Sequence, residues 1–249
     1  MVSAHAPARR ERIDAFGASL LVGFSVLLGL NQALVKLVNA GFSPLFQAGL
    51  RSASRVSLFF YTMPLWVAVG AHCLIATERL TVPRVLGLGL ALLGIALALL
   101  GGDQTDPGSS WVGDGLALAA SLCWAGIALL TRTTRLQETS PEMNLLYQLA
   151  VSTIVILPLA PLFGDVIREP TGLIYGIFAF QVIVVVAIGF VVWFWILSLY
   201  PVSNMASFSL LTPVFGIFFG WWVFDDALPP TFLAALGLVG AGLVLVNRR

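Results

Sequence analysis

The sequence predicts an all-α fold, a polytopic helical membrane bundle built as an inverted repeat, on the strength of three observations. The 249 residues are 59% hydrophobic and only 10% charged, with a mean hydropathy of +0.96, and a soluble domain of this size cannot bury that much apolar surface. The apolar runs are about 20 residues long, as membrane-spanning helices require, whereas a transmembrane barrel would show alternating runs of about ten. Two of the runs carry a proline at matching places.

Runs without charged residues divide the chain into eight predicted membrane-spanning helices. The first run is too long for the apolar part of a signal peptide, so we expect it to be a span. Pro201 divides a long charge-free stretch into two spans. The predicted spans are Phe16–Val38, Pro44–Ala76, Val85–Gly101, Gly113–Leu130, Met143–Phe163, Leu173–Leu199, Asn204–Phe224 and Thr231–Val246.

The distribution of Lys and Arg predicts that both termini are cytoplasmic. With the N-terminus inside, nine Lys or Arg residues fall in inside segments and only two, Lys36 and Arg168, fall outside. Short loops rich in Lys and Arg remain on the cytoplasmic side. The predicted outside loops carry acidic residues instead, among them Asp225 and Asp226.

Two proline-broken helices organise the sequence. Setting Pro64 on Pro213 also aligns Phe59 with Phe208. A proline inside a helix frees a backbone carbonyl, which lipid cannot satisfy, so neighbouring groups or a wet cavity must do so. Broken helices at matching places in two halves point to the binding site of a transporter. The hydroxyl groups that could satisfy the carbonyl freed at Pro213 are those of Ser207, Ser209 and Thr212.

The chain is expected to consist of two copies of one unit, residues 1–102 and residues 113–249. The second copy holds five predicted helices, and an odd number makes the two copies inverted in the membrane. The stretch between a Ser-Pro pair and the serine that opens the broken helix is 63 residues in the second copy but 11 in the first. The difference corresponds to about two membrane helices. We therefore predict that the first copy is shortened near residues 51–55.

Three segments resemble the EamA family of the drug/metabolite transporter superfamily. Residues 41–52, GFSPLFQAGLRS, resemble the start of its second helix, and residues 53–81 resemble its fourth helix with the acidic turn that follows. Residues 203–228, SNMASFSLLTPVFGIFFGWWVFDDAL, resemble its ninth helix and acidic turn. The resemblance implies a carrier of ten helices, in two inverted five-helix units, that moves amino acids, other metabolites or drugs, often outward. This chain departs from that pattern by the two helices absent from its first unit.

Two hypotheses about function follow. The first is a secondary membrane transporter, specifically an exporter, of small organic metabolites such as amino acids or drugs, which works by alternating access in the bacterial plasma (inner) membrane. The second is a non-transporting or partner-dependent membrane protein, an incomplete carrier bundle that pairs with itself as a homodimer or with another protein. The expected partners are the substrate and the lipid bilayer, with no nucleic acid and no cofactor. Because no Walker loop, HExxH, nucleophile elbow or Cys/His cluster occurs, we do not expect an enzyme.

Candidate substrate-binding residues are polar, aromatic or helix-breaking residues within the predicted spans. Arg51 is interpreted as an anion hook, with snorkelling to polar surface as the structural alternative. The amides equally suit hydrogen bonds between helices, and the tryptophans equally suit packing. The set comprises Asn31, Arg51, Tyr61, Pro64, Trp124, Gln148, Gln181, Trp193, Ser209, Thr212 and Pro213, and no metal ligand is expected.

Two smaller patterns complete the prediction. Glu78 and the pair Asp225–Asp226 follow the two broken helices in equivalent turns, where a polar residue at a helix end is the simplest interpretation. Glycines spaced four apart, as in Gly172–Gly176, favour close packing between membrane helices.

Overall fold

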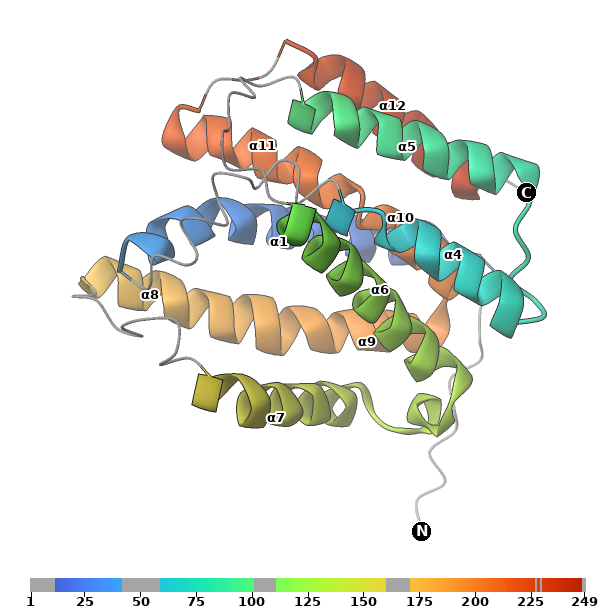
Figure 1. Ribbon diagram of the computed structural model, residues 1–249, viewed down its shortest axis with the longest axis horizontal. Helices are drawn as coiled ribbons and strands as arrows, with labels where there is room; N and C mark the ends of the chain where they lie inside the picture. Colours follow the sequence, from blue (N-terminus) through green and yellow to red (C-terminus); the bar gives the residue numbers. More distant parts are fainter. Residues whose placement is uncertain are drawn as a thin grey trace.

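The computed structural model describes residues 12–41, 59–100, 111–159, 171–226, 228 and 230–247. Every regular element within these ranges is a helix, which confirms the predicted all-α class for the described part of the chain (Figure 1). The elements are α1 (Ala15–Gly41), α4 (Met63–Leu74), α5 (Val82–Leu100), α6 (Trp111–Thr133), the 3₁₀ helix η1 (Arg135–Glu138), α7 (Pro141–Leu159), α8 (Gly172–Phe180), the π-helix η3 (Gln181–Gly189), α9 (Phe190–Leu199), α10 (Val202–Phe208), α11 (Leu211–Phe224) and α12 (Phe232–Asn247).

Four described stretches are long and apolar enough to cross a membrane. They are Ala15–Val35, Val112–Thr133, Gly172–Leu199 and Val202–Phe224, and Met63–Leu74, Val82–Ala98 and Phe232–Asn247 form shorter apolar helices. The predicted number of eight spanning helices therefore stays a prediction. The part of the predicted second span before residue 59, with Arg51 and the proposed shortening, lies outside the described residues.

The stretch Gly172–Leu199 departs from the uniform α-helix that the sequence predicts. Its middle part, η3, is a π-helix between α8 and α9. Five consecutive β-branched residues occupy positions 182–186. Such side chains crowd the preceding turn of an α-helix and slightly lower the preference for it.

The helices pack in pairs that join the first part of the chain to the second. α1 packs along α11, α4 along α6, and α5 along α12. The first pair runs in parallel, because Ser25 contacts Phe208, which precedes α11 at the end of α10, while Gly29 lies against Phe215 further along the chain in α11. The described helices before residue 101 are thus held mainly by helices after residue 110.

The α5–α12 pair brings two backbones into direct contact. A Cβ at Gly87 would lie 2.6 Å from the carbonyl oxygen of Gly242, and a Cβ at Gly242 would lie 2.5 Å from that of Gly87. Farther along, Gly94 lies against Ala235, so the two helices are antiparallel, as they run side by side in Figure 1. Small residues let membrane helices approach this closely.

Close packing at the predicted glycine pair Gly172–Gly176 is not found. A Cβ at either position would meet no atom within 4 Å among the described residues. The spacing alone does not say which glycines lie at a crossing, because that depends on where the helices meet.

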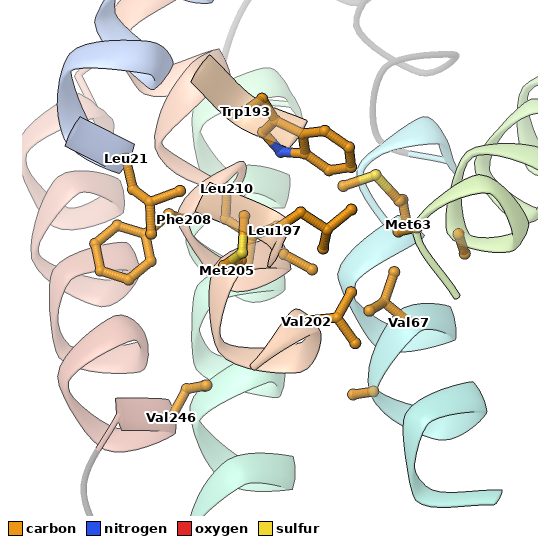
Figure 2. Close-up of a cluster of buried hydrophobic side chains, with 14 of the residues drawn as sticks. Leu21, Met63, Val67, Trp193, Leu197, Val202, Met205, Phe208, Leu210 and Val246 are labelled. Atoms are coloured by element: carbon orange, nitrogen blue, oxygen red, sulfur yellow. The ribbon is translucent and has the colours of Figure 1, made fainter. Parts of the chain in front are cut away.

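The core surrounds α10, whose seven residues are all buried. Figure 2 shows Met205 and Phe208 of this helix among side chains from other helices, including Met63 of α4 and Leu197 of α9. Large apolar side chains point outward instead. Leu233 is 78% exposed and Val82 and Ile154 are each 73% exposed, an exterior that suits lipid rather than water.

The glycine contact between α5 and α12 predicts a position-specific effect on stability. Gly242→Val would force the Gly87 backbone away, and overpacking of this kind costs about 1–3 kcal/mol, or several degrees in Tm. Gly240→Val is the matched control, since a Cβ there would meet nothing within 4 Å. Thermal unfolding in detergent measures both, and equal Tm values for the two variants would contradict the described crossing.

Candidate functional site

The second helix break separates α10 from α11 at Ser209 and Leu210. The N–H of Leu210 donates to the Ser207 carbonyl at 3.2 Å, and the N–H of Thr212 donates to the Ser209 carbonyl at 3.0 Å. The chain therefore tightens into 3₁₀ turns at the break. Pro213 lies in the first turn of α11, where its missing N–H costs little.

A serine of α1 satisfies the carbonyl at the end of α10. The Ser25 hydroxyl lies 3.0 Å from the Phe208 carbonyl oxygen and 2.9 Å from the Leu21 carbonyl oxygen of its own helix, so its one proton is shared between them, and Ser25 is 2% exposed. The hydroxyls of Ser207 and Ser209, expected to serve Pro213, donate instead to carbonyls within α10. The structure thus uses a neighbouring helix and the backbone where the sequence indicated local hydroxyls.

The first helix break lies at Tyr61 and Thr62, immediately before α4. The N–H and hydroxyl of Thr62 both donate to the Phe59 carbonyl, at 3.2 Å and 2.6 Å. Pro64 lies in the first turn of α4. The residues that the sequence aligns, Phe59 and Phe208, therefore both have a carbonyl oxygen at a helix break that accepts a hydrogen bond from a hydroxyl group.

Gln32 of α1 lies between the two broken helices. Its Nε2 donates to the phenolic oxygen of Tyr61, and its Oε1 lies 2.6 Å from where a Cβ of Gly216 on α11 would be. Tyr61 is 4% exposed, whereas Gln32 remains exposed. The structure thus joins the predicted Tyr61 to an amide outside the predicted set. The signal for Gln32 was its place beside Asn31, in the middle of the first span.

A second set of hydrogen-bonded side chains joins the start of α4 to α6. The Thr62 hydroxyl oxygen accepts a hydrogen bond from Trp66 Nε1 at 3.1 Å and lies 3.3 Å from the hydroxyl oxygen of Ser121. Ser121 is completely buried. None of these three residues was in the predicted set, because single hydroxyls in apolar runs are too common to select.

The predicted tryptophans come together beside this group. The rings of Trp124 on α6 and Trp193 on α9 are 4.8 Å apart and inclined at 68°, and Phe194 lies 5.0 Å from Trp193. Figure 2 places Trp193 close to Met63, in the first turn of α4. An edge-to-face aromatic group of this kind can pack against an apolar part of a substrate.

Among the buried polar atoms of the described residues that have no hydrogen-bond partner, three lie on the helices that form the two breaks or on α1. They are Asn31 Oδ1, Asn204 Oδ1 and Thr212 Oγ1. Thr212 is 3% exposed and Asn204 is 5% exposed. Because buried polar atoms are almost always hydrogen-bonded, these three are candidates to bind water or a ligand.

The remaining predicted residues lie apart from this arrangement. Gln148 on α7 and Gln181 at the start of η3 are half-buried, and neither takes part in the hydrogen bonds that join α1, α4 and α11. Arg51 lies outside the described residues.

A cavity of about 50 Å³, lined by Arg132, Asn144 and Phe194 among others, is too small for a metabolite. In the described ranges, no group of three or more His, Cys, Asp or Glu residues could hold a metal ion.

The helical fold, its apolar helices of bilayer length and its exposed apolar side chains define an integral membrane protein. The sequence profile of the EamA-like transporter family matches residues 111–248, which is more than half of the chain, and the protein belongs to that family. Membership confirms the resemblance seen in the sequence and places the chain in a family of transporters.

Three curated proteins are similar over most of the chain. The uncharacterized transporter YoaV of Bacillus subtilis (strain 168) is 24% identical over 213 residues, covering 84% of this chain and 72% of that protein. A probable amino-acid metabolite efflux pump of Salmonella typhimurium is 25% identical over 237 residues, covering 91% of this chain and 76% of that protein. A probable terminal-alkyne amino-acid exporter of Streptantibioticus cattleyicolor is 27% identical over 199 residues, covering 79% and 65%.

A solved crystal structure has the same fold. It superposes with a TM-score of 0.65 at 18% sequence identity, covering 93% of this chain and 90% of the other. At this identity the likeness concerns the fold alone.

The hydrogen bond from α1 to the second break predicts a stability effect. Ser25→Ala leaves the Phe208 carbonyl unpaired inside the bundle, and we expect a loss of about 1 kcal/mol, or about 2–4 °C in Tm. Ser19→Ala is the control, since that exposed hydroxyl bonds only within α1. Thermal unfolding of the two variants decides, and an unchanged Tm for Ser25→Ala would show that the carbonyl has another partner.

Proposed function

We propose that this protein is a secondary transporter that exports small organic metabolites, such as amino acids or amphipathic drugs, by alternating access between two inverted repeats. The observation that carries the proposal is the position of Gln32. This exposed amide of α1 contacts Tyr61 at the first helix break and lies against Gly216, just after the second. Broken helices that meet near the bilayer midplane form the substrate sites of many transporters.

The pairing of helices supports the inverted repeat. In an inverted repeat, α1 would correspond to α6, and α4 would correspond to the broken helix α10–α11. The α1–α11 pair of helices would then have the α6–α4 pair as its counterpart. Both pairs are present and both run in parallel, and α5 pairs with its own counterpart α12 in antiparallel fashion. A twofold axis in the membrane plane would produce this pattern.

The chemistry around the breaks supports a polar organic substrate with an apolar part. Gln32 and the unpaired oxygens of Asn31 and Thr212 can exchange hydrogen bonds with such a molecule. Trp124 and Trp193 can pack against its apolar part. Two of the similar proteins are named as an amino-acid exporter and an amino-acid metabolite efflux pump, which agrees with this substrate class.

The ends of the bundle support a location in the plasma (inner) membrane with both termini cytoplasmic. Arg79 and Arg84 lie where α4 leads into α5, and Arg132 and Arg135 lie where α6 leads into η1. In Figure 1 these two connections are at the same end of the bundle, and α11 ends at the other. Connections rich in arginine face the cytoplasm.

One observation favours the alternative of a homodimer. α1 packs against α8, η3 and α9, whereas its proposed counterpart α6 presents an exposed apolar stripe. Leu116, Ile127 and Leu130 lie on this stripe together with the exposed Cys123. A second copy could cover the face where the first repeat lacks two helices.

The proposed site predicts that Tyr61→Phe lowers transport. The change leaves the Gln32 amide without its phenolic partner. The loss of one neutral hydrogen bond corresponds to a roughly three- to tenfold lower kcat/KM for transport. Flux in proteoliposomes, tested with amino acids and amphipathic drugs, measures it. Tyr175→Phe is the control, because Tyr175 is 55% exposed on α8. A wild-type protein that moves none of these compounds would contradict the proposed function.

The homodimer alternative predicts disulfide crosslinking through Cys123. Mild oxidation of membranes that contain the wild-type chain would give a covalent dimer, which Cys123→Ser would abolish and Cys73→Ser would preserve. Gel electrophoresis without reducing agent provides the measurement. A chain that transports and remains monomeric under oxidation would exclude the alternative.

A further inference from the structure

Three charged side chains from distant parts of the chain converge on the turn between α9 and α10. Asp14, which precedes α1, accepts a hydrogen bond from the Tyr200 hydroxyl at 2.6 Å. Arg132, near the end of α6, donates to the Leu197 carbonyl in the last turn of α9 at 3.2 Å. Glu78, in the turn after α4, reaches the start of α10. The turn is thus tied to three helices at one end of the bundle.

Glu78 makes the most extensive of these contacts. Its Oε1 accepts a hydrogen bond from the N–H of Val202 at 3.1 Å, and its Oε2 accepts bonds from the N–H and the hydroxyl of Ser203 at 2.9 Å and 2.6 Å. The carboxylate is 4% exposed. It therefore does more than end a turn, which was the simplest interpretation of the sequence.

The start of α10 depends on this carboxylate. The residue at its N-cap is Pro201, which has no side-chain hydrogen bond to offer. The first N–H groups of a helix lack partners within the helix and carry partial positive charge, so a carboxylate supplies both hydrogen bonds and favourable electrostatics. Glu78 supplies these hydrogen bonds and this charge from the turn after α4, in the first part of the chain.

We propose that Glu78 is a positioning residue, and that its cap on α10 and the Tyr200–Asp14 hydrogen bond form a latch that holds this end of the transporter closed. The inference rests on the proposed alternating access, in which an end that is closed in one state opens in another. α10 leads directly into the break at Ser209 and Leu210. The latch therefore sets the position of the helix that carries Thr212 and Pro213.

Opening at this end separates the start of α10 from α4 and breaks the Glu78 hydrogen bonds. Glu78→Gln keeps the shape of the side chain but turns one acceptor into a donor that faces N–H groups. Loss of a hydrogen bond to a charged group shifts such an equilibrium by about tenfold or more. The variant thus opens more often at this end, and the maximal transport rate changes more than KM.

The first test measures opening without any substrate. A single cysteine replaces Ser207, which is completely buried on α10, in a chain that also carries Cys73→Ser and Cys123→Ser. Reaction with a polar maleimide is followed in nanodiscs, where both ends are accessible. We expect Glu78→Gln to raise the labelling rate about tenfold. Glu138→Gln, an exposed carboxylate at the same end, is the control and leaves the rate unchanged.

A second variant keeps the proposal testable if Glu78→Gln does not fold. Tyr200→Phe removes one hydroxyl and leaves the ring against Gly17, so we expect a smaller rise in labelling, of a few fold. Size-exclusion profiles and helical circular dichroism confirm folding. Labelling as slow as in Glu138→Gln, for every variant that folds, overturns the latch.

Because labelling needs no substrate, its failure is separable from failure of the proposed function. Faster labelling in a chain that moves no tested compound supports the latch and counts against the substrate class. Transport with unchanged labelling counts against the latch and leaves the transporter proposal intact.

Discussion

A helix that breaks inside a bilayer must have each freed backbone group satisfied by protein or by enclosed water, because lipid offers no hydrogen bonds. Much of the described structure follows from this constraint at the two breaks. The Phe208 carbonyl requires a hydroxyl, and Ser25 provides it from α1, which places α1 against the broken helix. At the end of the bundle, away from the breaks, the start of α10 likewise requires acceptors, and Glu78 provides them from the turn after α4. The polar groups therefore lie inside the bundle, and the outside can be apolar.

The same contacts hold the first part of the chain, before residue 101, in place. Its described helices α1, α4 and α5 each have their main partner in the second part of the chain, namely α11, α6 and α12. The second part provides a scaffold of α7, α8–η3–α9 and α10–α11 on which the others rest. The described helices of the first part therefore depend on contacts with the second part more than on contacts with one another.

The positions of the described helices could be predicted from the sequence, because a helix inside the hydrocarbon core requires a charge-free run of bilayer length. The prolines likewise predicted both breaks. The side chains that hydrogen-bond to the broken helices and to the start of α10 could not be predicted. Ser25, Gln32 and Glu78 have no distinguishing sequence pattern, and only the fold brings their partners close to them. The π-helical form of η3 also escaped prediction, since a run of valine and isoleucine fits either kind of helix in lipid. The place of Arg51 stays a prediction.

The length of α12 affects the surrounding lipid. Its 16 residues rise 1.5 Å each, about 24 Å in all, whereas a typical hydrocarbon core is about 30 Å thick. Because Leu233 and Val244, near its two ends, are exposed, this flank meets the acyl chains directly. A hydrophobic helix shorter than the hydrocarbon core is accommodated by local thinning of the bilayer, by snorkelling of flanking side chains or by association with other helices.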